Sequence, residues 1–122
     1  MKINIRDTVK DYKGKDMMTA EKEGGKERKM TTRDALNAVV NGVEVTQQGQ
    51  QALISAEDKA KIFQLSSKLW NVSKEIDLSV EELAFIKDRA GKVANITPLV
   101  YGRVVDLLEN KHGKQEIENK EN

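Results

Sequence analysis

The 122-residue sequence predicts a mainly α-helical fold: a small domain of three to four helices with a short N-terminal β-hairpin, a flexible linker and a polar tail. Three observations favour this fold. Apolar residues recur at helical spacing in several segments after residue 30, and helix-capping residues precede those segments. Apolar residues make up 38% of the chain and charged residues 34%, so only a small core can form. The length fits one domain.

Residues 1–18 are predicted to form the hairpin. Ile3 and Ile5 alternate with polar neighbours, and Gly14 lies in a turn at residues 11–15, where glycine can adopt the positive φ of a tight turn. An isolated hairpin is only marginally stable in water, so it would have to rest on the helices or pair with another chain. Residues 19–30 are rich in Lys, Glu and Gly, which is the composition of a flexible linker.

The helical domain is predicted over residues 31–110. The first helix follows the capping Thr31, the second follows Ser55, and the third follows Ser79 in a full capping box with Glu82. Beyond the last helix the chain is polar, so residues 111–122 are predicted to be a disordered tail.

The last helix is predicted over Thr97–Glu109 and is apolar on nearly every side. Threonine at the N-cap and Pro98 at the first helical position favour its start. A helix of this kind belongs at the centre of a core, so we expect the other helices to wrap around it. We interpret Gly91 and Gly102 as positions where the third helix could approach it closely.

The sequence predicts no enzyme, metal site, cofactor or small-molecule substrate. It holds no cysteine and one histidine, His112, and it lacks the phosphate-binding and metal-binding motifs. Adjacent carboxylates occur in first helical turns, where acidic side chains complement the helix dipole. No apolar run approaches the length of a membrane span and no secretory signal is present, so we expect no membrane partner and a cytoplasmic protein.

Three side chains are candidate contacts for a protein partner or for self-association. Phe63 and Trp70 are seven residues apart on one side of the second helix, and they are either core aromatics or interface anchors. Arg103 lies three residues before Asp106, so it either pairs with that acid at the edge of the core or faces a partner. The leading hypothesis is therefore a non-enzymatic protein-interaction module.

The alternative is a nucleic-acid-binding accessory factor that uses residues 22–33 as a basic arm. Residues 1–34 contain ten Lys or Arg against seven Asp or Glu. Glutamates lie between these cations and weaken any attraction to phosphates, so a solvated linker is the competing interpretation. The cations of the arm are Lys22, Lys26, Arg28, Lys29 and Arg33.

Two parts of the sequence resemble small phage and prophage proteins. One is the D-x-x-G-K turn at Asp11–Lys15, and the other is the block that runs from Asp77-Leu78-Ser79 through Pro98-Leu99-Val100 to Leu107-Leu108-Glu109. The resemblance covers residues 1–18 and 53–109 and leaves the linker unmatched. It implies an N-terminal hairpin, a C-terminal helical block and a phage-encoded protein. Those proteins are largely of unassigned role, so the resemblance implies no catalytic residue.

Overall fold

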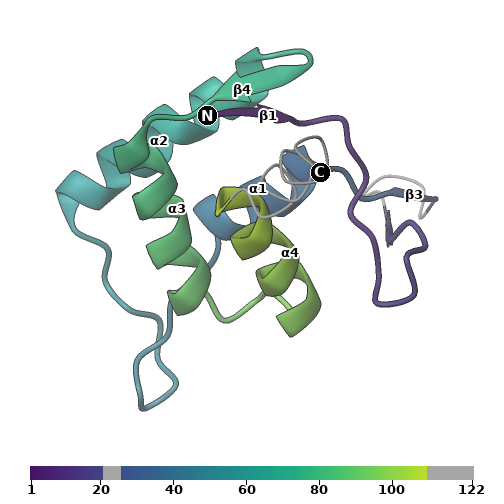
Figure 1. Cartoon of the computed structure of the whole chain (residues 1–122). Coiled ribbons are helices and arrows are strands. Elements are labelled where there is room, and N and C mark those ends of the chain that lie inside the picture. The colour runs from purple at the N-terminus through teal and green to yellow at the C-terminus, as the bar shows by residue number, and fades with distance from the viewer. Residues whose placement is uncertain (21–25, 110–122) are drawn as a thin grey trace, which may run out of the picture.

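The protein is described by a computed structural model that covers residues 1–20 and 26–109 (Figure 1). The described residues form a small mixed domain: its four helices agree with the predicted mainly helical fold, and short antiparallel strand pairs accompany them. In chain order the elements are β1 (Lys2–Asn4), β2 (Met18–Ala20), β3 (Glu27–Lys29), α1 (Thr32–Val40), α2 (Ala56–Asn71), β4 (Glu75–Asp77), α3 (Val80–Lys92) and α4 (Pro98–Leu108).

Helix α1 lies at the centre of the fold, with α2, α3 and α4 packed against it (Figure 1). Thr31 caps it: the threonine hydroxyl accepts a hydrogen bond from the Asp34 N–H, and the Asp34 carboxylate accepts one from the Thr31 N–H. Its buried side chains include Leu36 and Val39, which are almost completely shielded from solvent. The shared core consists of Ile3, Ile5, Val9, Ala35, Leu36, Val39, Val40, Leu65, Leu69, Ile76, Leu78, Ile86, Ala90, Val100, Val104 and Leu108.

Helix α4 does not occupy the centre, so that expectation was wrong. Its buried residues are Val100, Val104 and Leu108, which follow one another at four-residue spacing along a single stripe. Tyr101 is exposed, and Leu107 is only partly buried. The apolar residues of a helix do not determine which of its sides has neighbours, and α4 packs with one side against α3 and α1.

The glycines of α3 and α4 do not mark a close helix–helix approach. A Cβ atom added at Gly91 or Gly102 would meet no heavy atom within 4 Å. The tight position is Gly42, just after α1, where an added Cβ would lie 2.6 Å from the Ala38 carbonyl oxygen and 2.7 Å from Val93 Cγ1.

The predicted hairpin of residues 1–18 forms only around its turn, where Lys10 pairs antiparallel with Asp16 and the Met17 N–H donates to the Val9 carbonyl at 2.8 Å. The pairing of its first strand differs from the prediction. Strand β1 pairs antiparallel with β4, which follows α2, and Ile3 lies opposite Ile76 (Figure 1). This pairing buries Ile3 and Ile5 in the core, and a local hairpin alone could not shield them. The predicted turn is present: Asp11 N–H donates to the Lys15 carbonyl at 2.8 Å, and Gly14 has a φ of 84°.

The described part of residues 19–30 is not a free linker. Strands β2 and β3 form an antiparallel pair in which Thr19 lies opposite Arg28. Backbone hydrogen bonds also join Val9, Met17 and Met30. Residues 21–25 of the predicted linker and the predicted tail, 111–122, lie outside the described residues.

Candidate functional site

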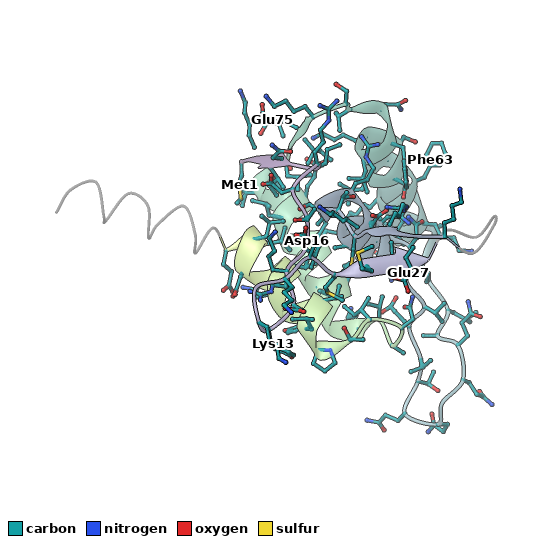
Figure 2. The ribbon with its side chains drawn as sticks, turned by 90° about the vertical axis from the view of Figure 1, so that its right-hand side faces the viewer. Met1, Lys13, Asp16, Glu27, Phe63 and Glu75 are labelled. Atoms are coloured by element: carbon teal, nitrogen blue, oxygen red, sulfur yellow. The ribbon has the colours of Figure 1, made fainter. Side chains whose placement is uncertain are left out.

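Helix α2 presents two large aromatic side chains to solvent. Ser55 caps the helix by accepting a hydrogen bond from the Asp58 N–H at 3.1 Å, and Leu65 and Leu69 form its buried line. Phe63 is 73% exposed and Trp70 is 53% exposed. Phe63 lies at the outer edge of the molecule in Figure 2. Of the two interpretations of these aromatics, the structure favours a surface position over a core position.

Polar side chains of α1 and α2 join the region between the two aromatics. The Asn41 side-chain amide donates to Ser66 Oγ at 2.9 Å and to Asn37 Oδ1 at 2.9 Å. The Trp70 indole N–H donates to the same Asn37 oxygen at 3.2 Å. We call the surface formed by Phe63, Trp70, Asn37, Asn41 and Ser66 the α2 aromatic face. Hydrogen bonds between the two helices hold these side chains in place.

A cleft borders each aromatic residue. The Phe63 cleft, about 350 Å³, is lined by the end of α1, by α2 and by the segment before α2, and its apolar side chains include Ile54 and Ile62. The Trp70 cleft, about 560 Å³, lies between the N-terminal segment, the start of α1 and the end of α2. Its residues are Ile5, Arg6, Thr31, Arg33, Trp70, Asn71, Val72 and Ser73.

The segment of residues 43–54 projects from the body of the protein next to the Phe63 cleft (Figure 1). It folds back on itself through a hydrogen bond from the Thr46 N–H to the Gln50 carbonyl at 2.7 Å, and Gly49 takes a positive φ of 81° in the turn. Val45 and Leu53 expose their side chains, Leu53 completely. Ile54 of this segment lines the Phe63 cleft.

Arg89 on α3 is a buried charge that the sequence pattern did not indicate. It is 2% exposed and is one of the residues that line the Phe63 cleft. Its guanidinium donates to Glu44 Oε2 at 2.7 Å and to the Gly42 and Val40 carbonyl oxygens at 2.7 and 3.1 Å. These bonds hold the projecting segment and the end of α1 to α3. The sequence feature that could have indicated this buried charge is the position of a basic residue on the apolar stripe of the third helix.

Arg103 has a structural position away from the α2 aromatic face. Its guanidinium donates to the Lys10 carbonyl at 2.8 Å and to the Asp11 carbonyl at 2.6 Å. These bonds fasten the Asp11–Lys15 turn to α4. Neither of the two sequence interpretations, a pair with Asp106 or a contact to a partner, anticipated this arrangement.

The cations of the predicted basic arm contact acids and an aromatic ring of the same chain. Arg28 makes a bidentate ion pair with Asp34 at 2.7 and 2.9 Å, and Lys29 pairs with Asp16 at 3.2 Å. Burial raises the pKa of Asp34, but the Arg28 guanidinium and the Thr31 N–H more than offset this effect and hold its pKa below the usual range.

The remaining members of the arm are separate from these ion pairs. Arg33 donates to the Val72 carbonyl, and its guanidinium lies 5.3 Å from the centre of the Trp70 ring. Lys26 is exposed, and Lys22 lies outside the described residues.

Comparisons with protein-family models, curated proteins and solved structures give no match. Within residues 1–20 and 26–109, no helix has the length and apolar character needed to cross a membrane. In the same part of the chain, no three His, Asp or Glu side chains converge in a way that could hold a metal ion.

Proposed function

We propose that this protein is a non-enzymatic protein-interaction module that binds its partner through the α2 aromatic face. The observation that carries the proposal is the exposure of Phe63 and Trp70 on one side of one helix, each beside a cleft. Tryptophan and other large aromatic side chains are typical interface anchors, because they bury much apolar area at a low cost in conformational entropy. The polar residues between them, including Asn37 and Asn41, can supply directional hydrogen bonds.

The proposal includes the phage context and the host cytoplasm that the sequence resemblance implies. The partner is then a host or virion protein, or a second copy of this chain. The nucleic-acid alternative has less support, because Arg28 and Lys29 are already paired with Asp34 and Asp16. Counterion release on phosphate binding requires available cations, and the net charge of the chain is only +1.

A site-specific crosslinking experiment tests the proposal. A photoreactive benzoylphenylalanine at position 63 should crosslink to a partner in host extract or to a second copy of this chain. Size exclusion with light scattering distinguishes these two products by their mass. The matched control is the same residue at position 12, because Tyr12 is 79% exposed in the turn fastened to α4. Crosslinks of equal yield at both positions would contradict a specific surface.

Truncation of the anchors gives the quantitative test. Phe63→Ala and Trp70→Ala should each weaken capture of the crosslinked partner by roughly 30-fold or more, since anchor residues typically contribute about 2 kcal/mol or more. Tyr12→Ala should leave capture unchanged. If both α2 variants capture the partner as well as the unchanged protein does, this face is not the binding site.

A further inference from the structure

The Trp70 cleft contains two arginines that the fold places side by side. Arg6 follows β1 and Arg33 lies in the first turn of α1, and both line the cleft. The Arg6 Nε–H donates to the Ser73 carbonyl at 2.8 Å, and Arg33 donates through Nη2 to the adjacent Val72 carbonyl. Consecutive carbonyls after the end of α2 therefore fix both guanidinium groups.

Donor groups of both arginines remain for a ligand. Within the described part of the chain, the two Nη atoms of Arg6 and the Nη1 atom of Arg33 have no hydrogen-bond partner. The Nε of Arg33 also has no partner, but it is buried, so the available donors are the Nη atoms. Two guanidinium groups thus lie in one cleft with donors available.

No acidic side chain is among the residues that line this cleft. The lining residues carry two positive charges and no negative one. Like charges held close together repel, and an anion between them would relieve that repulsion and accept hydrogen bonds from both. Trp70 forms one wall, and its ring stacks against Arg33 at 5.3 Å. The cleft therefore suits an anionic group attached to a chain that packs on the indole.

We propose that the Trp70 cleft binds a carboxylate side chain of an acidic peptide segment. This inference rests on the proposed function and names the chemistry of the partner. A peptide carboxylate is favoured over a nucleic acid because the exposed acids Asp7 and Glu75 lie within two residues of Arg6 and Ser73. These acids would repel an extended polyanion, whereas a single carboxylate can pair with the arginines locally.

Trp70 makes the test direct, because it is the only tryptophan of the chain. The probe is a synthetic glycine hexapeptide with one glutamate, acetylated and amidated, titrated at low salt while Trp70 fluorescence is recorded. The comparison peptide has glutamine in place of glutamate. We expect a saturable change with the acidic peptide and at least tenfold weaker binding of the glutamine peptide, since hydrogen bonds to charged groups are the stronger ones.

Arg6 is the residue to change, because its side chain is exposed and its loss leaves the core intact. Arg6→Gln should weaken binding of the acidic peptide about tenfold or more, and Arg6→Lys should recover part of the loss. The matched control is Lys13→Gln, which removes one exposed positive charge in the Asp11–Lys15 turn (Figure 2). That variant should bind within about twofold of the unchanged protein, because its charge is screened at a distance. Far-ultraviolet circular dichroism confirms the fold of each variant.

Three results would overturn the inference: equal binding of the two peptides, an unchanged affinity in Arg6→Gln, or tighter binding of a single-stranded oligonucleotide than of the acidic peptide. The proposed function fails separately. Phe63→Ala should weaken partner capture as stated above and leave hexapeptide binding unchanged, because Phe63 lies outside the Trp70 cleft. Partner capture through Phe63 without any hexapeptide binding would therefore reject only the carboxylate site.

Discussion

Arg89 shows how one side chain holds three separate segments together. Its guanidinium joins α3 to the Val40 carbonyl at the end of α1, to the Gly42 carbonyl just beyond it and to Glu44 of the projecting segment. A buried ion pair adds little compared with an apolar pair of the same shape, but removal of one partner leaves the other charge and the carbonyls without hydrogen bonds. The stability of this region therefore depends on Arg89 keeping all of these hydrogen bonds.

Arg89→Ala should lower the free energy of unfolding by about 3–5 kcal/mol, the usual effect of breaking a buried ion pair. Urea denaturation of the purified variant measures this change. Arg89→Lys is the control: lysine keeps the charge but lacks the planar fork, so it should restore less than half of the loss. A loss below about 1 kcal/mol in Arg89→Ala would mean that the contacts contribute little.

At the level of the helices and their connections, glycine has opposite effects on stability at two positions. Gly42 lies where α1 ends, and an added methyl group would overlap the Ala38 carbonyl oxygen at 2.6 Å. Gly91 lies inside α3 with open space around it. At the first position the backbone needs the absence of a side chain, and at the second glycine only adds conformational freedom to the unfolded chain.

We expect Gly42→Ala to destabilise the protein by about 1–3 kcal/mol through overpacking. Gly91→Ala should instead stabilise it by about 0.5–1 kcal/mol, because alanine is the better helix former. Thermal unfolding followed by circular dichroism compares the two variants directly. A stabilising Gly42→Ala would show that the segment can move away from the added methyl group.

For the molecule as a whole, Ile3 and Ile5 of the N-terminal segment are part of the core. Ile5 is almost completely buried, and β1 closes the fold by pairing with β4, which lies more than seventy residues further along the chain. Ile5→Ala should therefore cost about 2–5 kcal/mol, as expected for a large-to-small core change. Denaturant unfolding measures this cost. A hairpin that folded separately from the helices would instead leave the main unfolding transition unchanged.

Acid should destabilise the whole fold through its paired carboxylates. Lys10, Thr8 and Lys29 hold the pKa of Asp16 below its usual range. A carboxyl group with a lowered folded-state pKa stabilises the fold above its unfolded pKa, near 4, and that contribution is lost as the pH falls further. The melting temperature should therefore decrease from about pH 4 downward.

Asp34→Asn tests whether the Asp34 carboxylate contributes to the loss of stability in acid. The pKa of Asp34 is also lowered, and its ion pair with Arg28 would be removed. The variant should be less stable than the unchanged protein near neutral pH and should lose less stability between pH 4 and pH 2. Parallel curves for the two proteins over this range would exclude Asp34 as a contributor.

The sequence by itself determined the local features of this protein. Caps at Thr31, Ser55, Ser79 and Thr97 begin the four described helices, and the Asp11–Lys15 turn forms where glycine permits a positive φ. These features depend on residues a few positions apart, and such short-range hydrogen bonds and backbone preferences are readable from sequence.

The tertiary structure alone decided which segments meet. It paired β1 with β4, centred the core on α1 and brought Arg6 and Arg33 together beside Trp70. It also left Phe63 in solvent although its helix has a buried side. Strand pairing and burial depend on how much apolar area distant segments shield from solvent. The periodicity of one segment does not say which distant segments will cover it.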